Sequence, residues 1–197
     1  EADPETLAAD YLNAEAGFGD AATVLAGARD ILVQRLADDA DLAGRLREEM
    51  GKRGHVVPTA GDEAERDTRF TDYIDRNERV RDLPAHRTLA LLRGREAGAL
   101  RLSLVHERDL EAPEGSPDQC EAIIAGHWGL AHATGPCAPW LRQTVRRAWR
   151  VKIASRLETE IFRQLREAAE EEAVRVFATN LRNLLLAPPA GARPVLA

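Results

Sequence analysis

Aromatic residues, cysteines and long apolar runs are scarce in this sequence of 197 residues. No apolar run approaches the roughly 20 residues that a helix needs to span a bilayer, so no membrane contact is predicted. The only cysteines, Cys120 and Cys137, are too few for a disulfide framework, and we expect a cytoplasmic protein. Because only 5% of the residues are aromatic, the core must be built mainly from Ala, Leu and Val.

The residues that are abundant favour helices. Ala, Leu, Arg and Glu head the ranking of helix propensity, whereas the residues that favour strands are few. The apolar share of 44% is enough for a packed core, and the length suits one sizeable domain or two small ones. We therefore predict a mainly α, multi-helical fold with one long C-terminal helix and a minor, short β element.

The two ends of the chain suggest a piece of a longer protein. The sequence lacks an initiator methionine, and its first residues are acidic, unlike a signal or transit peptide. Residues 188–197 contain three prolines and a glycine, a composition typical of a linker. We expect a further domain to follow this linker.

Charge is distributed unevenly along the chain. The formal net charge is −6 overall, but residues 1–50 alone carry −8 and the remainder is close to neutral. Within that remainder, residues 140–157 contain no acidic residue. Six cations occur there, namely Arg142, Arg146, Arg147, Arg150, Lys152 and Arg156.

Two interpretations of this basic stretch remain open. Arg142, Arg146 and Arg150 are spaced four residues apart, where like charges destabilise an isolated helix, so an anionic group should face them. That group is either the phosphate of a nucleic acid, bound with steep salt dependence, or the acidic helices of residues 1–50 folded back. Trp149 belongs to an apolar stripe and is expected in the core, although a tryptophan here could also stack on bases.

Periodicity and capping signals predict helices in the first third of the chain. Asp3 and Pro4 are typical of a helix start, and a short helix through Tyr11 and Leu12 should follow them. Apolar residues three and four apart predict one helix from Asp20 and a second ending at a glycine near residues 51–54. The apolar face of the helix from Asp20 is expected to comprise Val24, Ala28, Ile31, Leu32 and Leu36.

The middle of the chain mixes strand and helix signals. Residues 55–58 are expected to form a short strand, and residues 62–76 a helix. A compact helix over 85–92 should be closed by Gly94. Leucines alternate with polar residues over 98–105, which predicts a half-buried strand.

The last third is the most regular part of the sequence. A short helix is expected over 118–128, and a full apolar stripe runs through 141–153. Ser155 with Glu158 resembles a capping box, which predicts that a new helix begins there. Apolar residues then recur every four positions over 157–185, predicting a helix of about 30 residues and about 45 Å. Such a helix is too long to be packed at every turn, so part of it should act as a strut or contact another domain.

The search for catalytic and metal-binding residues gives one weak candidate. Cys120, His127, His132 and Cys137 have a C-x6-H-x4-H-x4-C spacing that matches none of the usual zinc signatures. The alternative is a core cysteine with loop histidines and no metal. No nucleophile with a base partner and no phosphate-binding glycine loop occurs, so we predict no enzyme and no cofactor.

Many ordered blocks of this sequence resemble the bacterial Tex family of transcription accessory proteins. The most extensive are LAGARDIL at 25–32, VRRAWR at 145–150 and LREAAEEEA at 165–173. Further blocks lie at 11–13, 72–73, 84–87, 93–95, 140–141, 157–160, 176–178, 180–182, 184–187 and 189–191. The resemblance covers nearly the whole chain.

The resemblance implies a position within a larger protein. Tex-like proteins are mostly helical and bind nucleic acid, and they carry an RNase H-like (YqgF-type) domain after a helical N-terminal region, then helix-hairpin-helix modules and an OB-fold domain. On this basis residues 1–110 are an N-terminal helical region with the short β element, and residues 118–187 a central helical region ending in the long helix. Residues 188–197 are then the linker toward the RNase H-like domain.

We therefore predict a helical scaffold fragment of a nucleic-acid-binding transcription accessory protein that takes part in transcription regulation or elongation. The six cations of residues 142–156 are the candidates for contact with RNA or DNA, and the transcription machinery is a further expected partner. The alternative function is a protein-interaction and domain-positioning module with no nucleic-acid contact of its own.

Overall fold

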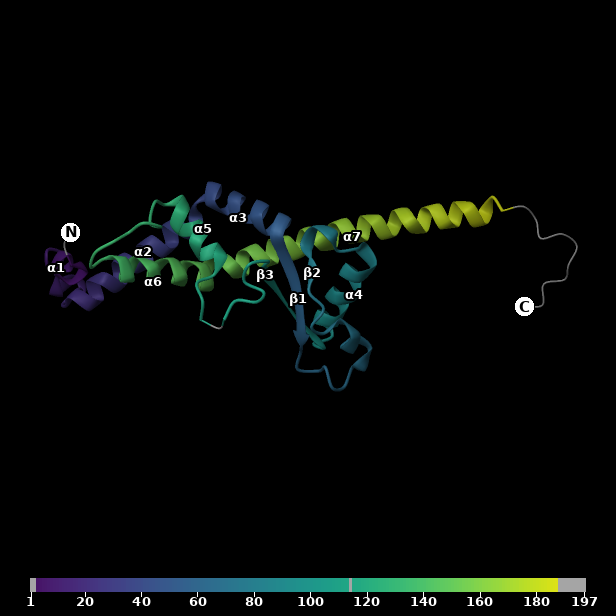
Figure 1. Ribbon diagram of the computed structural model, residues 1–197, viewed down its shortest axis with the longest axis horizontal. Helices are drawn as coiled ribbons and strands as arrows, with labels where there is room; N and C mark the ends of the chain where they lie inside the picture. The colour runs from purple at the N-terminus through teal and green to yellow at the C-terminus, as the bar shows by residue number, and fades with distance from the viewer. Residues whose placement is uncertain (1–2, 114, 188–197) are drawn as a thin grey trace, which may run out of the picture.

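The computed structural model describes residues 3–113 and 115–187, and one helix dominates its shape. This helix, α7 (Ala154–Leu185), has 32 residues and runs along the long axis of an elongated molecule. The other elements gather around and ahead of its first half, and its distal half projects beyond them (Figure 1). The long C-terminal helix, the mainly α fold and the minor β element are all confirmed.

Capping aspartates begin the N-terminal helices. Asp3 caps α1 (Pro4–Ala9), and a 3-10 helix (Ala14–Ala16) follows. Asp20 accepts a 2.7 Å bond from the Thr23 amide at the start of α2 (Ala21–Asp38). Asp39 likewise accepts a 2.9 Å hydrogen bond from the Leu42 amide at the start of α3 (Ala40–Arg53). The predicted helices in this region are confirmed, with the first one ending a few residues early.

The buried face of α2 differs from the predicted one. Val33 and Leu36 are buried, whereas Ile31 is 61% exposed. At about 100° per residue, Ile31 lies roughly 140–200° around the helix from those two residues. The prediction for Ile31 was wrong because α2 turns the side with Val33 and Leu36 toward α6 and the rest of the core.

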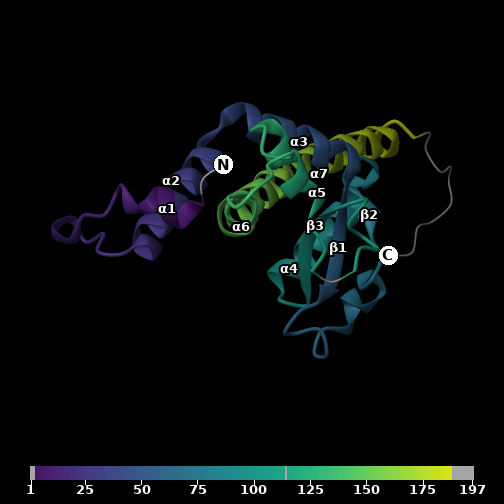
Figure 2. The ribbon, with the colours of Figure 1, turned by 60° about the vertical axis from the view of Figure 1, so that its left-hand side comes forward.

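The three strands form one small antiparallel sheet in the order β2-β1-β3. β1 (Gly54–Ala60) pairs with β3 (Leu100–His106) over its full length, and β2 (Glu78–Arg79) pairs with the start of β1. α4 (Ala85–Glu96) packs against β3 and against α7 (Figure 2). Both predicted strands are confirmed.

The segment before β2 departs from the prediction. A helix over residues 62–76 was expected, but only 3-10 helices form nearby, at Thr68–Tyr73 and Val80–Asp82. The amides of Gly61 and Glu63 donate to the carbonyls of Ala99 and Gly98, which ties this segment to the turn before β3. Because the segment has few apolar residues to bury on one face of a helix, its backbone conformation is set by these hydrogen bonds to the turn before β3.

Gly94 lies inside α4 and does not end it. A Cβ at this position would lie 2.6 Å from Leu100 Cδ1 and 2.9 Å from Phe70 Cδ1, so only glycine allows the close packing. The chain leaves the helix at Gly98, whose φ is +71°. The predicted stop was therefore four residues early because Gly94 serves packing against the sheet.

The last helices form one continuous rod. After α5 (Gln119–His127), α6 (Ala138–Ala148) passes through a π-helical turn (Trp149–Ile153) directly into α7. No helix begins at Ser155, and Glu158 accepts a 3.0 Å bond from the Leu104 amide on the free side of β3. The predicted capping box was wrong because Glu158 bonds across to the sheet.

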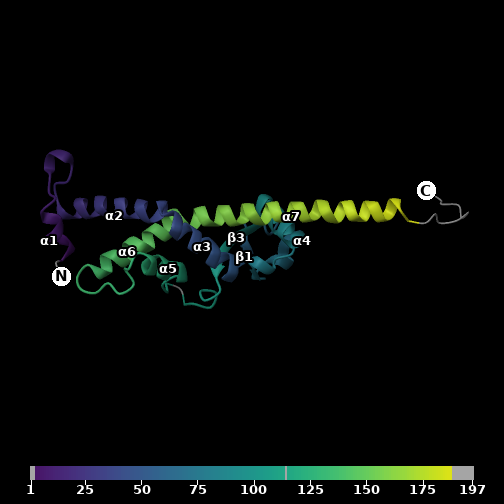
Figure 3. The same cartoon turned by 90° about the horizontal axis from the view of Figure 1, so that it is seen from above.

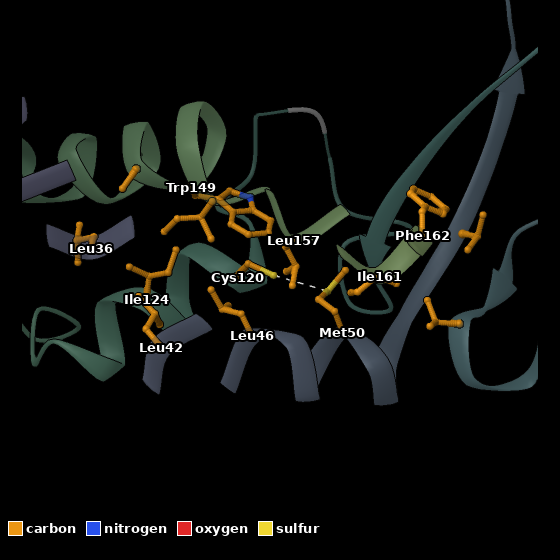
Figure 4. Close-up of a cluster of buried hydrophobic side chains, with 14 of the residues drawn as sticks. Leu36, Leu42, Leu46, Met50, Cys120, Ile124, Trp149, Leu157, Ile161 and Phe162 are labelled. Atoms are coloured by element: carbon orange, nitrogen blue, oxygen red, sulfur yellow. Dashed lines mark hydrogen bonds between the residues drawn. The ribbon is translucent and has the colours of Figure 1, made fainter. Parts of the chain in front are cut away.

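The core lies where α3, α5 and the first half of α7 meet. Leu42, Leu46 and Met50 of α3 face Ile124 of α5 and Leu157 of α7 (Figure 4). Along α7 the last buried residue among those described is Ala169, and the side chains beyond it are exposed except for the half-buried Glu172. In the view from above, this distal part stands apart from the other labelled elements (Figure 3).

Helices from both predicted regions contribute to this core. α2 packs on α6, α3 packs on α5, and α4 packs on α7. The division into residues 1–110 and 118–187 stays a prediction, and the predicted linker 188–197 lies outside the described residues. Over the described ranges, no helix is both long and apolar enough to cross a membrane.

Candidate nucleic-acid interface

The six predicted cations follow one another along the rod formed by α6, the π-helical turn and α7. We call this set the basic rod. Its members are Arg142, Arg146 and Arg147 on α6, Arg150 and Lys152 on the π-helical turn, and Arg156 on α7. Arg146 is half-buried and the other five are exposed. The π-helical turn keeps Trp149 and Ile153 in the core while Arg150 and Lys152 face solvent.

One carboxylate from α5 faces two of these arginines. Oε1 of Glu121 lies 3.4 Å from Nε of Arg146 and 3.7 Å from Nε of Arg150. Arg146 also donates through Nη2 to the Gly115 carbonyl at 3.2 Å. The Glu121 side chain is only 11% exposed, and burial raises its pKa while Arg146 and then Arg150 act in the opposite direction. The column of arginines is therefore balanced locally by one buried acid.

The acidic N-terminal block packs on α6 through α2 but makes few ion pairs with the cations of the basic rod. Within residues 3–113 and 115–187, the only ion pair between an acid of the first fifty residues and one of the six cations joins Asp30 to Arg147 at 3.6 Å. Both side chains in that pair are more than half exposed, so the pair contributes little to stability. Arg156 donates to the Ala37 carbonyl at the end of α2 at 3.3 Å.

Three cations of the basic rod have no carboxylate partner in the part of the chain that the structure describes. These are Arg142 near the middle of α6, Lys152 in the π-helical turn, and Arg156, which donates to the Ala37 carbonyl. Together with the weakly held Arg147, they leave positive charge available to an external anion. The rod is thus capable of contacting phosphate oxygens, which guanidinium groups bind with two parallel hydrogen bonds.

The tryptophans near the basic rod are engaged inside the protein. Trp149 is 7% exposed, and its Nε1 donates to Asp118 Oδ2 at 2.8 Å, which confirms its predicted place in the core. Trp140 is half-buried, and the guanidinium carbon of Arg29 lies 5.4 Å from its ring centroid. The interface is therefore built from charge, with little stacking surface.

The candidate zinc residues do not gather around one point. Cys120 is buried with Sγ 3.7 Å from Met50 Sδ, and burial raises the pKa of its thiol well above the usual range. His127 instead contacts Asp39 at 3.1 Å and Arg45 at 3.0 Å. Among the described residues, no group of three or more His, Cys, Asp or Glu is placed to hold a metal ion.

Sequence reasoning missed the contribution of Glu121. This residue lies 25 positions before Arg146, and their contact depends on how α5 crosses α6 in space. A helix of nine residues, which is the length of α5, gives no signal for that crossing. The only hint was the like-charge spacing of the arginines, which indicated that an anion should lie nearby.

Comparison with known proteins places the chain in a family. Residues 1–177 match the family described as Tex central region-like. Protein tex of Bordetella pertussis is 46% identical over 98% of this chain, and Protein YhgF of Escherichia coli is 41% identical over 98%. The transcriptional accessory protein Tex of Neisseria gonorrhoeae is 42% identical over 96%.

The relatives are much longer than this chain. The chain spans about a quarter of their length, 24–25% in these three cases. The family match, by contrast, covers most of the chain and includes the whole basic rod. The chain therefore belongs to the Tex family and corresponds to its central region.

Proposed function

We propose that this chain is a helical scaffold within a transcription accessory protein and that its basic rod contacts the phosphates of RNA or DNA. The association with transcription is supported by the relative from Neisseria gonorrhoeae, whose name describes a transcriptional accessory protein. The proposal assigns the chain a binding and positioning role and no catalytic step.

The observation that carries the proposal is the solvent-facing row of cations along one rigid rod. Arg142, Arg146 and Arg150 are spaced four residues apart on α6 and the adjoining turn, and among the described residues only Glu121 opposes them. A rigid helix holds such charges about 6 Å apart, which matches the spacing of successive phosphates to within a few ångström. The backbone that carries these cations is already ordered, so binding does not have to order a loop.

The test is salt-dependent binding of the chain to labelled nucleic acid. We expect fluorescence anisotropy to show binding of a single-stranded RNA or a DNA duplex at about 50 mM salt that weakens steeply by about 200 mM. Arg146→Glu together with Arg150→Glu should reduce the affinity at least about tenfold, because two phosphate contacts become repulsive. Circular dichroism of the double variant checks that it remains folded.

A matched control separates a local interface from net charge. Arg175→Glu together with Arg182→Glu makes the same charge change on the distal part of α7, where both side chains are exposed. This control should bind within about twofold of the wild type. Equal loss in both double variants, or no binding by the wild-type chain at low salt, would remove the basic rod from the proposal.

A second candidate function is supported by the distal half of α7. Val174, Phe177, Leu181 and Leu184 are exposed there, at spacings of three and four residues that form one apolar stripe. An apolar stripe on a projecting helix suits a protein-interaction and domain-positioning module without nucleic-acid contact. The absence of nucleic-acid binding in the test above would favour this candidate.

A further inference from the structure

A groove lies beside the basic rod, between α5 and α6. Its volume is about 630 Å³, and its walls come from the loop before α5, α5 itself, the connection over residues 128–137, and α6. Aliphatic side chains make up most of the lining, with Ala125, Leu130, Leu141 and Val145 among them. Arg142 and Arg146 complete the lining on the α6 side. The groove is therefore apolar along its floor and positively charged along one edge.

We infer that this groove binds an acidic amphipathic helix or helical segment of a partner protein. A helix that docks in a groove places apolar residues at i, i+3, i+4 and i+7 on the floor. The flanking face of such a helix can then carry carboxylates one turn apart. Arg142 and Arg146 are also one turn apart, so an acidic face is complementary to this edge in both charge and spacing.

The contact with Glu121 supports carboxylates as the preferred anion at this edge. Arg146 already holds the Glu121 carboxylate within the groove lining, with its Nε 3.4 Å from Oε1. Arg142 lines the same groove, and the described residues provide no carboxylate partner for it. A partner's Asp or Glu beside Arg142 would extend the arrangement that Arg146 makes with Glu121.

The lining favours a peptide over a nucleotide base. Successive bases of a single strand are bound chiefly by stacking on aromatic side chains. Among the described residues that line this groove, none is aromatic. Branched and small aliphatic side chains instead match the Leu, Ile and Val residues of an amphipathic helix. The basic rod can contact phosphate along its outer side without using the floor of the groove.

The test uses a synthetic probe and variants of the groove. The probe is a fluorescein-labelled peptide of about 16 residues, made of Leu and Glu with Leu at i, i+3, i+4 and i+7. A scrambled peptide of the same composition is its control. We expect anisotropy to show binding of the amphipathic probe, at least about tenfold tighter than the scrambled one and weakened by salt.

Two substitutions alter the groove and leave all six cations in place. Ala122→Glu on α5 and Ala131→Glu on the opposite wall each put a bulky carboxylate at an exposed lining position. Each should weaken binding of the probe at least about tenfold, because a like charge then faces the acidic peptide. Ala178→Glu on distal α7, also exposed, is the matched control and should leave binding unchanged.

Parallel measurements with RNA keep the outcomes distinct. Ala131→Glu should retain RNA binding within about threefold, because the cations of the basic rod remain. Equal binding of the scrambled probe, unchanged probe binding in both groove variants, or selective loss of RNA binding in those variants would each overturn the inference. Absence of RNA binding by the wild-type chain would overturn the proposed function alone, since the peptide measurement does not depend on RNA binding.

Discussion

Glu121 is the residue on which the charge balance of the basic rod depends. It is the one carboxylate in the described ranges that pairs with both Arg146 and Arg150. An external phosphate that approached these two arginines would have to compete with this internal acid. Burial of Glu121 holds it in place, because α5 packs on α6 around it. Nucleic-acid affinity at this surface should therefore be limited by Glu121.

We expect Glu121→Gln to strengthen RNA binding by about threefold to tenfold at low salt. The substitution keeps the shape of the side chain and one accepting oxygen but removes the negative charge between the two arginines. The slope of binding against salt should also become steeper by about one charge. Fluorescence anisotropy over a salt series measures both quantities. Glu167→Gln, which removes an exposed acid paired with Arg163, is the control and should change neither.

Asp109 presents a different case, a carboxylate that the fold disfavours in its charged form. Both of its carboxylate oxygens accept hydrogen bonds from the backbone amide of Gln119, at 3.0 and 3.2 Å. Burial raises the pKa of Asp109, and the nearby negative charge of Asp118 adds to this, against the effect of the amide bond. Asp118 meanwhile caps α5 and accepts from the indole of Trp149. Two acids therefore share the start of one short helix.

We expect Asp109→Asn to stabilise the protein at neutral pH. Because the pKa of Asp109 is raised on folding, the folded state binds its proton more tightly, and stability contributed by this group is lost as pH rises through the carboxyl range. A neutral Asn that still accepts from Gln119 should add about 0.5–1 kcal/mol to the free energy of unfolding at pH 7.5. The gain should shrink by pH 4.5, as measured by urea unfolding at both values.

The exposed Asp72→Asn serves as the control for this comparison. Its stability change should be small and should vary little between the two pH values. If Asp109→Asn behaved in the same way as Asp72→Asn, the two acids at the start of α5 would not oppose one another.

At the level of elements, local signals in the sequence predicted where several helices begin and which segments form the long helix and the sheet. Asp20, Asp39 and Asp118 each begin a helix with a side-chain bond to the backbone, and capping residues can be recognised without knowing the fold. The strand over 98–105 and the long helix followed from their periodicity. Burial of Val33 and exposure of Ile31 did not follow, because the choice of face depends on which partner helix α2 meets.

Residues whose role is set by distant neighbours were misread for the same reason. Glu158 fits a capping pattern, but in the fold it lies beside the Leu104 amide, 54 positions away in sequence. Glu121 and the π-helical turn depend similarly on how α5, α6 and the core meet. The candidate interface was thus predictable as a run of cations, whereas its internal counter-charge was visible only in three dimensions.

Gly94 provides a test of packing between elements. Gly94→Ala should lower the free energy of unfolding by about 1–3 kcal/mol, because its Cβ would meet Leu100 and Phe70 at less than 3.0 Å. This loss should exceed the gain of up to about 1 kcal/mol that alanine brings to a helix interior. Urea unfolding gives the difference directly. Gly44→Ala in α3, where nothing lies within 4 Å of the added Cβ, should be stabilising instead.

A stabilised Gly94→Ala variant would contradict this account of α4. It would mean that the helix can move away from β3 at little cost. The opposite signs expected for Gly94 and Gly44 make the comparison independent of helix propensity, because both positions lie within helices.

The whole molecule is divided into a packed body and a helical segment that no other described element supports. The body holds the sheet, the core around α3 and α5, and the basic rod, whereas the distal half of α7 projects from it (Figures 1 and 3). Phe177 is 67% exposed and Leu184 75% exposed on that projection. Helices in water gain most of their stability from packing of an apolar face, which this segment does not have within the described residues.

We therefore expect the two halves of α7 to differ in amide hydrogen exchange. Amides over 157–169 should exchange only on global unfolding, because Leu157, Ile161 and Ala169 are buried. Amides over 174–184 should exchange faster by at least about a hundredfold at low micromolar concentration, through local opening of a helix with no tertiary support. Mass spectrometry of peptic peptides resolves the two segments.

Raising the protein concentration about a hundredfold tests whether a second copy protects the distal helix. Protection that appears only at high concentration requires a second copy covering the apolar stripe. Slow exchange over 174–184 at every concentration would show instead that the helix is stable without a partner.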